Sequence, residues 1–180
     1  MFRRGDRVVY PHHGATVIED VVEREMFGKR STYFKLRLAH GNLTLMVPVA
    51  STEQVGMRGV VSRDEVEKVF DLLREDEGWM PILWNQRFKS NRAKLVSGDI
   101  YQVAEVVRDL SISDRRKGLS AAEKRLLAKA REILISELTF AVDSTEEIAE
   151  TMLDDALEVP PRSDLSTREL AAAGQNVPLA

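Results

Sequence analysis

The chain has 180 residues, of which 43% are hydrophobic and 31% are charged, and its formal net charge at pH 7 is −3. This balance is typical of a globular protein with one ordinary domain or two small ones. No apolar run approaches the ~20 residues that a membrane-spanning helix needs, and the first residues lack the apolar segment of a signal peptide. The absence of cysteine excludes disulfides and thiolate metal sites and fits a reducing cytoplasm, so we expect a cytoplasmic protein.

Charge is distributed unevenly along the chain. Residues 1–60 and 81–140 have net charges of +3 and +5, whereas residues 61–80 and 141–180 have net charges of −4 and −7. The acidity therefore comes from a short connecting segment and the C-terminal end, and the middle of the chain is basic. A basic region favours contact with phosphates whatever the total charge, although a solvated helix face would have the same composition.

The first sixty residues predict β-strands. The segments DRVVYP, ATVIEDVVERE, STYFKLRLA and LTLMVPV are rich in β-branched, aromatic and aliphatic residues, and turn sequences with glycine or asparagine separate them. Within TYFKLRL, Phe34, Leu36 and Leu38 alternate with Tyr33 and two basic residues, as in a strand that is buried on one side. Four or five short strands predict a small SH3-like or Tudor-like β-barrel.

A helical period begins at residue 62. Asp99 can cap one helix. Three further segments with apolar residues at helical spacing each follow a capping box, which is a serine with a glutamate three residues later. These pairs are Ser62/Glu65, Ser120/Glu123 and Ser144/Glu147. We therefore expect a bundle of about five helices over residues 62–158, each too short to be stable alone in water.

The sequence thus predicts an α+β protein with two domains. Residues 1–60 are expected to form the β domain, and residues 61–158 are expected to form the helical domain. Pro160 and Pro161 end the last helix, and little apolar periodicity follows them. We therefore expect residues 159–180 to be a disordered tail.

No pattern points to catalysis, a metal or a cofactor. His12 and His13 are adjacent, so on a strand their side chains would point to opposite faces, and no third ligand stands at a metal-site spacing. The turn after Pro11 explains this pair better. The chain lacks the phosphate-binding, nucleophile and zinc motifs of common enzymes, and its carboxylates fall mostly at helix starts and on exposed faces. We expect a protein that is not an enzyme and has no cofactor.

Trp84 stands at the start of the basic segment MPILWNQRFKSNRAKL, residues 80–95. On a helix that begins near Pro81, Trp84, Phe88 and Leu95 share a face, so burial in a core is one explanation. The alternative is an apolar wedge surrounded by cations, with which minor-groove binders open a base step. The residue pattern leaves both explanations open. The cations near such a wedge would be Arg87, Lys89, Lys94 and, from another helix, Lys124.

Several segments resemble the CarD family of bacterial transcription regulators, most closely its actinobacterial members. They follow one another in order from residue 1 to about residue 158, and the tail lies outside the resemblance. These segments are GDRVVYPHHGATVIE, LTLMVPV, VGMRGVV, WNQRFKSNRAKLVSGD, VAEVVRDL and GLSAAEKRLLAKAREILISEL.

The resemblance implies two partners. A Tudor-like N-terminal domain would bind the β subunit of RNA polymerase, and the helical domain would contact promoter DNA at the upstream edge of the transcription bubble. There a tryptophan enters the minor groove and stabilises the open complex without reading a particular sequence. By the matching pattern W-x-x-R-x-K and the basic position in EKR, the DNA-binding residues would be Trp84, Arg87, Lys89 and Lys124.

Two more positions match polymerase contacts, and two residues depart from the family pattern. Arg24, in ERE, matches a contact arginine, whereas Met46, in LTLMVPV, stands where close relatives have a basic residue. Polymerase binding would then depend more on backbone pairing of strands, which is insensitive to side-chain identity. Gln86 stands where relatives can have a further arginine, so one phosphate contact would be missing.

We therefore predict a monomeric transcription regulator that binds RNA polymerase and promoter DNA together. An alternative is an adaptor that binds polymerase and recruits a second protein through its helices without touching DNA, in which case Trp84 would be buried. An enzyme acting on nucleic acid would need a carboxylate cluster or a metal site, which the sequence does not show. The exposure of Trp84, and its position relative to Arg87, Lys89 and Lys124, separates these alternatives.

Overall fold

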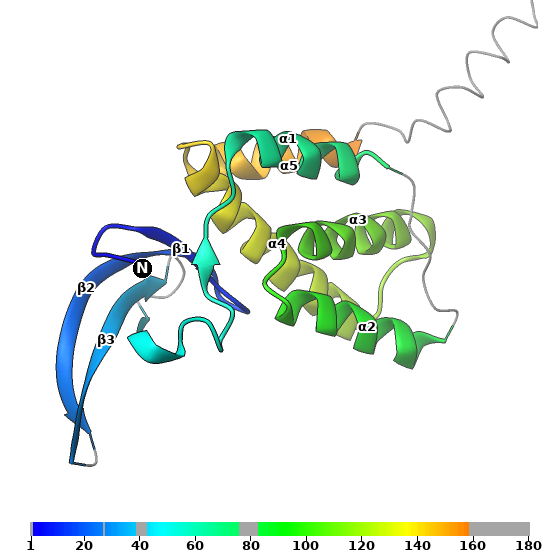
Figure 1. The fold of residues 1–180 in the computed structure, drawn as a ribbon. Helices are drawn as coiled ribbons and strands as arrows, with labels where there is room; N and C mark the ends of the chain where they lie inside the picture. Colours follow the sequence, from blue (N-terminus) through cyan, green and yellow to red (C-terminus); the bar gives the residue numbers. More distant parts are fainter. Residues whose placement is uncertain (1, 27, 39–42, 76–82, 159–180) are drawn as a thin grey trace, which may run out of the picture.

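The computed structural model describes residues 2–26, 28–38, 43–75 and 83–158. An antiparallel sheet of five strands is followed by five α-helices, and the sheet stands beside the helices (Figure 1). The predicted α+β class, with a Tudor-like β part before a helical bundle, is confirmed. The predicted tail and Pro81 lie outside the described residues.

The sheet has the strand order β4-β3-β2-β1-β5, so β4 and β5 lie at its edges. A long hairpin of β2 and β3 extends away from the helices (Figure 1). The register of this hairpin shifts between Ile18 and Asp20, a bulge that bends the strand. The strands are β1 (Arg7–Tyr10), β2 (Gly14–Met26), β3 (Lys29–Leu38), β4 (Thr44–Pro48) and β5 (Arg58–Gly59), with a short 3₁₀ helix η1 (Val49–Ser51) after β4.

One face of the sheet covers a small hydrophobic core. The predicted alternation in β3 is confirmed, because Phe34, Leu36 and Leu38 are buried. Phe34 and Leu36 pack in one cluster with Val8, Ile18, Val47 and Met57. Each such side chain stabilises the fold by ~1.5–3 kcal/mol on burial, so the β part has a core of its own.

The helices are α1 (Arg63–Leu73), α2 (Trp84–Val96), α3 (Ile100–Lys117), α4 (Ala121–Ala141) and α5 (Glu146–Glu158). Capping boxes at Ser62 and Ser120 are confirmed, as is the cap at Asp99, which accepts a hydrogen bond from the Tyr101 N–H at 2.9 Å. The third box is wrong by one residue. Thr145, and not Ser144, directly precedes α5, and its hydroxyl accepts a hydrogen bond from the Ile148 N–H at 3.4 Å. The prediction failed because two adjacent residues with hydroxyl groups could each cap the helix.

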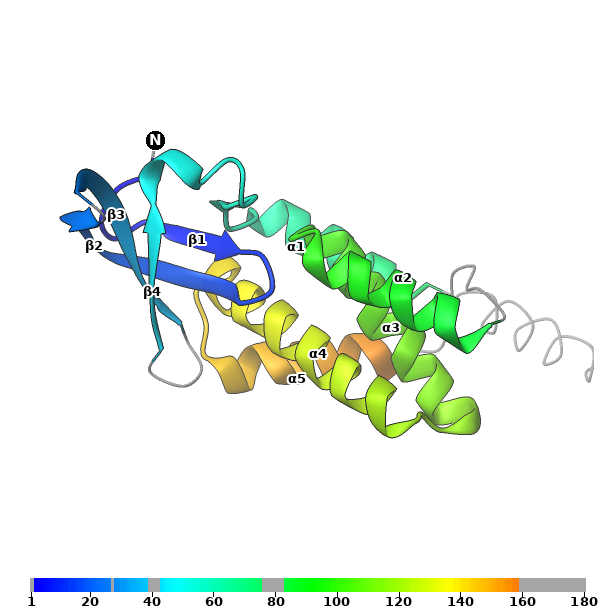
Figure 2. The ribbon, with the colours of Figure 1, turned by 90° about the horizontal axis from the view of Figure 1, so that it is seen from below.

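Two helices, α3 and α4, form the centre of the bundle. Val106, Val107, Leu110, Leu134 and Leu138 are at most 1% exposed. In Figure 1, α1 and α5 lie together on one side of α3 and α2 lies on the opposite side; Figure 2 shows α2 and α4 from below. None of the described helices combines the length and apolar character required to cross a bilayer.

The sheet packs directly on α4. Gly14 has a φ of 81°, and a Cβ there would lie 2.3 Å from the Ser136 Oγ and 3.3 Å from the Ile133 Cα. The next residue, Ala15, donates its N–H to the Ser136 Oγ at 2.9 Å in a buried hydrogen bond. Only glycine permits this approach at this backbone conformation, so the turn between β1 and β2 is held against α4.

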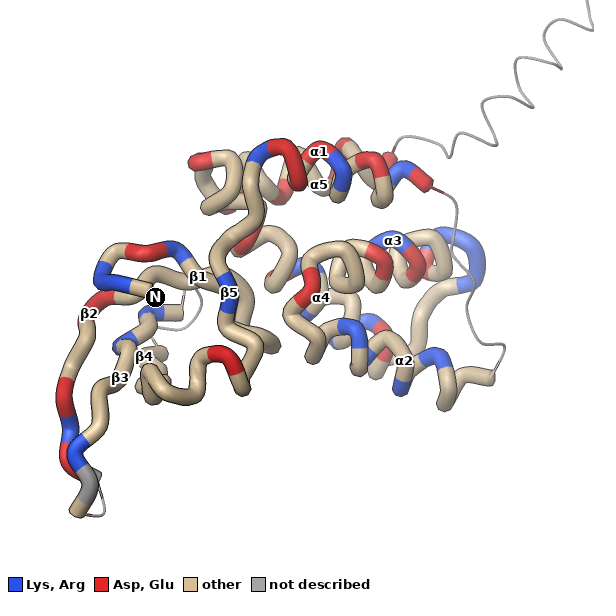
Figure 3. The backbone as a smooth tube through the Cα atoms, in the orientation of Figure 1, with Lys and Arg blue, Asp and Glu red and all other residues tan. Residues whose placement is uncertain are grey.

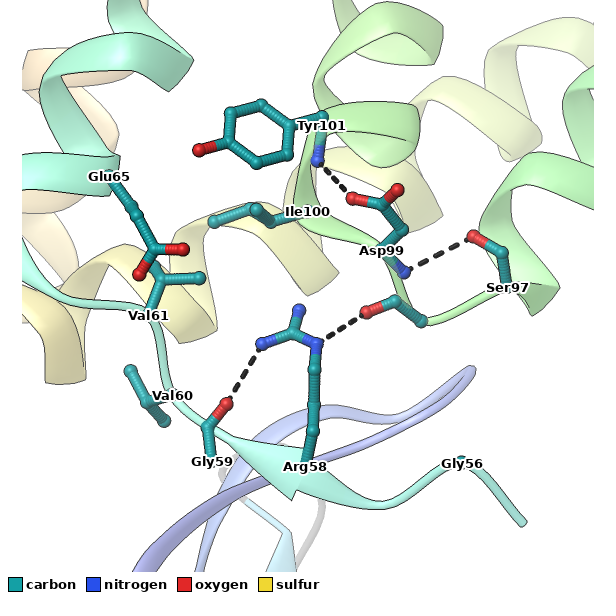
Figure 4. A pocket seen from close by; sticks show the side chains of 11 residues that line it. Gly56, Arg58, Gly59, Val60, Val61, Glu65, Ser97, Asp99, Ile100 and Tyr101 are labelled. Atoms are coloured by element: carbon teal, nitrogen blue, oxygen red, sulfur yellow. Dashed lines mark hydrogen bonds between the residues drawn. The ribbon is translucent and has the colours of Figure 1, made fainter. Parts of the chain in front are cut away.

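A partly buried arginine makes a second connection between sheet and helices. Arg58 donates to both carboxylate oxygens of Glu137, at 2.6 and 2.9 Å, and to the Gly98 carbonyl at 2.9 Å (Figure 4 shows the Gly98 bond). Glu137, only 2% exposed, also accepts from the Val61 N–H at 3.1 Å. Arg58, Val61 and Gly98 also line a pocket of about 370 Å³ beside this junction. The junction fixes how the sheet is oriented on the helices.

Candidate nucleic-acid and polymerase interfaces

Trp84 is the first residue of α2, and its side chain is exposed. Its exposed fraction is 44%, and the preceding Leu83 is 62% exposed. The indole stacks on the Phe88 ring, one turn later, with 5.3 Å between centroids and 16° between planes. Within α2 the buried residues are Asn91 and Leu95. The structure therefore favours the exposed explanation for Trp84 over burial in the core.

Arg87 lies in a buried ion pair. Its guanidinium donates to the Glu123 Oε1 from Nη2 at 2.8 Å and from Nε at 3.3 Å, and the two side chains are 12% and 7% exposed. The other oxygen, Oε2, accepts from the Ser120 N–H at 3.0 Å and from its hydroxyl at 2.7 Å. One carboxylate therefore caps α4 and holds α2 at the same time.

The electrostatics of Glu123 follow from these bonds. Burial alone would raise the pKa of Glu123, but the hydrogen bonds from Ser120 and Arg87, with the positive charge of Arg87, lower it from 4.5 to about 2. The carboxylate is ionised at neutral pH. The first turn of α2, with Trp84, is thus fixed to the first turn of α4.

Of the other predicted cations, Lys89 and Lys124 are exposed, whereas Lys94 is partly buried and pairs with Glu105 of α3 at 2.8 Å. Lys89 lies on α2, and Lys124 directly follows Glu123 on α4, where the two first turns meet. Gln86 is exposed on α2 as well. Lys89 lies five positions after Trp84, which places it about 140° around the helix from the indole. The arrangement brings Trp84, Arg87 and Lys124 to one end of the bundle and leaves Lys89 on its flank.

Three basic residues near Trp84 were missed by the sequence interpretation. Arg92 follows Phe88 by one turn on α2, and Arg125 and Lys129 are one turn apart on α4. They line one groove between these helices. Figure 3 shows basic residues along α2, and the sequence of this helix contains no acidic residue. The i, i+4 spacing was visible in the sequence, but the packing of α2 on α4 was not.

The predicted polymerase residues lie on the sheet. Arg24 is exposed near the end of β2 opposite Ser31, and Met46 is 38% exposed on β4 opposite Lys35. Strand alternation, read across the register, places both on the face opposite the buried Phe34. In the described part of the chain, β4 pairs with β3 alone, so its other edge presents backbone N–H and C=O groups.

The histidine pair belongs to a turn. His12 has a φ of 70°, His13 donates its N–H to the Tyr10 carbonyl at 3.0 Å, and its ring lies 5.5 Å from the Tyr10 ring. Burial, and then the charge of Lys129, lowers the pKa of His13. A group of three or more potential metal ligands does not occur among the residues that the structure describes.

Comparison with known proteins matches both parts of the chain. Residues 2–61 match the family described as CarD-like/TRCF RID domain, and residues 68–154 match the family described as CarD, C-terminal domain. A relative from Bacillus subtilis (strain 168), named "Putative transcription factor YdeB", is 36% identical over 146 residues, which cover 81% of this chain and 95% of that protein. The chain belongs to the CarD family. The resemblance found in the sequence motifs is confirmed.

Membership of the CarD family indicates a role in transcription regulation. CarD-family proteins are transcription regulators associated with RNA polymerase, and they are not known as enzymes. The match to an RID domain, a module that interacts with RNA polymerase, covers all five strands. The sheet is therefore the part of this CarD-family chain that matches the polymerase-interacting domain family.

Proposed function

We propose that this CarD-family chain, as a monomer, binds the β subunit of RNA polymerase through its sheet and contacts promoter DNA at the upstream edge of the bubble through α2. The contact with DNA stabilises the open complex. The observation that carries this proposal is the exposed Trp84, stacked on Phe88 at the start of a helix without acidic residues. A soluble helix has no packing reason to expose an indole there.

The mechanism rests on stacking at a parted base step. The stack with Phe88 holds the indole in one orientation, so little side-chain freedom is lost when a base lies against its open face. Base–aromatic stacking contributes ~1–3 kcal/mol. Because this contact forms with melted DNA and not with the closed duplex, it shifts the equilibrium toward the open complex by its differential affinity.

Cations around the wedge supply sequence-independent affinity. Lys89 and Lys124 are exposed and free to approach phosphates. Arg87 was predicted to do the same, but its pairing with Glu123 competes with a phosphate contact. We assign Arg87 to the orientation of α2, and hence of Trp84.

The polymerase contact uses the open edge of β4. An extended strand of the β subunit can pair with the backbone of this edge, whatever side chain stands at Met46. Arg24, on the same outer face, adds a charged contact. Because the sheet is fixed to α4 through Arg58 and Gly14, binding polymerase holds α2 near the DNA and raises its effective concentration. Weak contacts with DNA then suffice.

Two substitutions test the proposal. Trp84→Ala should shorten the open-complex lifetime by about fivefold or more, since a loss of 1–3 kcal/mol corresponds to that range, and should leave polymerase capture unchanged. Arg24→Glu should weaken capture of the β subunit. An adaptor that never touches DNA predicts a lifetime insensitive to Trp84→Ala while capture stays intact, and that result would contradict the DNA contact.

A further inference from the structure

A groove of about 320 Å³ runs between α2 and α4. Its floor is aliphatic, with Leu95, Leu126 and Ile133, and its rim is basic, with Arg92, Arg125 and Lys129. Among the described residues, no aspartate or glutamate lines it. Three positive charges in one groove without a lining acid repel one another, and a bound anion relieves this repulsion.

The two arginines on the rim are available to a ligand. Arg92 and Arg125 are exposed, and neither forms an ion pair within the described ranges. Lys129 is 41% exposed and pairs with Glu132, which does not line the groove, at 2.8 Å. Guanidinium groups suit phosphate because their donors match two oxygens at once.

The groove continues directly from Trp84. Phe88 lines it and stacks on the indole, and Trp84, Phe88 and Arg92 follow one another at i, i+4 and i+8 along one side of α2. Eight residues span about 12 Å of helix, which corresponds to three to four base pairs of duplex rise. A duplex whose parted step meets Trp84 therefore presents backbone phosphates along the groove.

The sheet closes the groove at one side. His12, in the turn between β1 and β2, is a lining residue. This turn is held in place because Gly14 packs against Ile133 and Ser136 of α4. The imidazole offers an N–H donor to an anion. Both parts of the chain thus contribute to one surface, which is built before any ligand binds.

We propose that this groove is a phosphate-binding track in which Arg92, Arg125 and Lys129 hold the DNA backbone of the duplex upstream of the step at Trp84. The inference rests on the proposed DNA contact and adds binding residues to it. An acidic peptide would satisfy the same charges, but the continuity of the groove with the exposed Trp84 and Phe88 stack favours DNA.

The test uses the full chain bound to polymerase on a promoter. Dissociation of the open complex is measured over a range of salt concentrations for Arg92→Ala, Arg125→Ala and the double variant. Both residues are exposed, so melting temperatures should be unchanged. Removal of two phosphate contacts should lower the steepness of the plot of log stability of the complex against log salt concentration by about 2. The lifetime of the double variant should be shorter than that of the parent at low salt and converge with it at high salt. Lys68→Ala, which removes one exposed charge from α1, is the matched control for each single variant.

The possible results distinguish failure of the phosphate-binding groove from failure of the proposed DNA contact at Trp84. If the groove variants behave like Lys68→Ala while Trp84→Ala still shortens the lifetime, the phosphate track is wrong and the DNA contact at Trp84 stands. If Trp84→Ala has no effect either, the proposed function fails first. If the groove variants lose binding of a polyglutamate peptide, measured by fluorescence anisotropy, and keep the parent lifetime, the groove is a peptide site and the inference is overturned.

Discussion

Both ends of α4 carry an arginine–glutamate pair, and the two pairs connect different parts of the molecule. Near the start of α4, Glu123 binds Arg87 of α2. Near its end, Glu137 binds Arg58 of β5. One pair holds the helix that carries Trp84, and the other holds the sheet that carries the proposed polymerase contact. Glu123 and Glu137 are 14 positions apart on α4, and this spacing sets the distance between the two pairs.

The pairs differ in how much of the structure depends on them. Arg58 binds both oxygens of Glu137 and a backbone carbonyl, and Glu137 also accepts a backbone N–H, with 2% exposure. Arg87 binds one oxygen of Glu123, and the second oxygen serves the cap at Ser120. The orientation of the sheet is therefore fixed more firmly than the position of α2.

The largest effect on stability is expected at the sheet end. Arg58→Ala leaves the buried Glu137 carboxylate without its partner, which typically costs about 3–5 kcal/mol of unfolding free energy. Urea unfolding at pH 7 measures it. Arg63→Ala, at an exposed arginine of α1 that donates to the Val142 carbonyl, is the control and should lose far less. Equal losses of unfolding free energy for the two variants would show that the Arg58–Glu137 pair stabilises the fold no more than an exposed arginine does.

A smaller effect is expected at the α2 end, and it should depend on pH. Glu123→Gln should cost about 1.5–3 kcal/mol at pH 7, the range for hydrogen bonds to charged groups. The pKa of Glu123 is lowered to about 2 in the folded chain, so its contribution is fully present above its ordinary value near 4.5. It is lost as the pH falls through about 2.

The measurement is the difference in unfolding free energy between the parent chain and Glu123→Gln over this pH range. That difference should narrow steadily from pH 5 to pH 2 as the parent is protonated. The comparison removes the contribution of Glu19 and Glu65, whose pKa values are also lowered, because both proteins contain them. A difference that stays constant down to pH 2 would mean that the ionised form of Glu123 does not bind Arg87.

Local features were predictable from the sequence, and pairings distant in sequence were not. The alternation at Phe34 and Leu36 and the caps at Ser62 and Ser120 depend on neighbours within a few residues. The Ser144 cap was misplaced because Thr145, one residue later, has an equivalent hydroxyl. The strand alternation and the helix caps are therefore local features, which depend on residues close together in the sequence.

The candidate site shows the opposite case. Arg87 was interpreted as a phosphate contact because its partner lies 36 residues away, and Glu123 was already explained as a capping residue. The rim at Arg92 and Arg125 likewise exists only because α2 packs on α4. Sequence patterns give the identity of such side chains, whereas the tertiary packing decides which of them face solvent and which face one another.

The smallest loss of stability is expected for Trp84→Ala. The indole is 44% exposed and stacks on Phe88, so truncation should cost about 1 kcal/mol, the range for an aromatic pair at a surface. Leu95, on the same helix but 4% exposed, is the matched control, since Leu95→Ala should cost about 2–5 kcal/mol. Thermal unfolding of the two variants distinguishes a residue that α2 exposes from one that α2 buries.

If Trp84→Ala lowers the melting temperature as much as Leu95→Ala does, Trp84 is a packing residue and α2 has no free wedge to offer DNA. A stable Trp84→Ala chain that still captures polymerase makes any fall in open-complex lifetime a property of the missing indole.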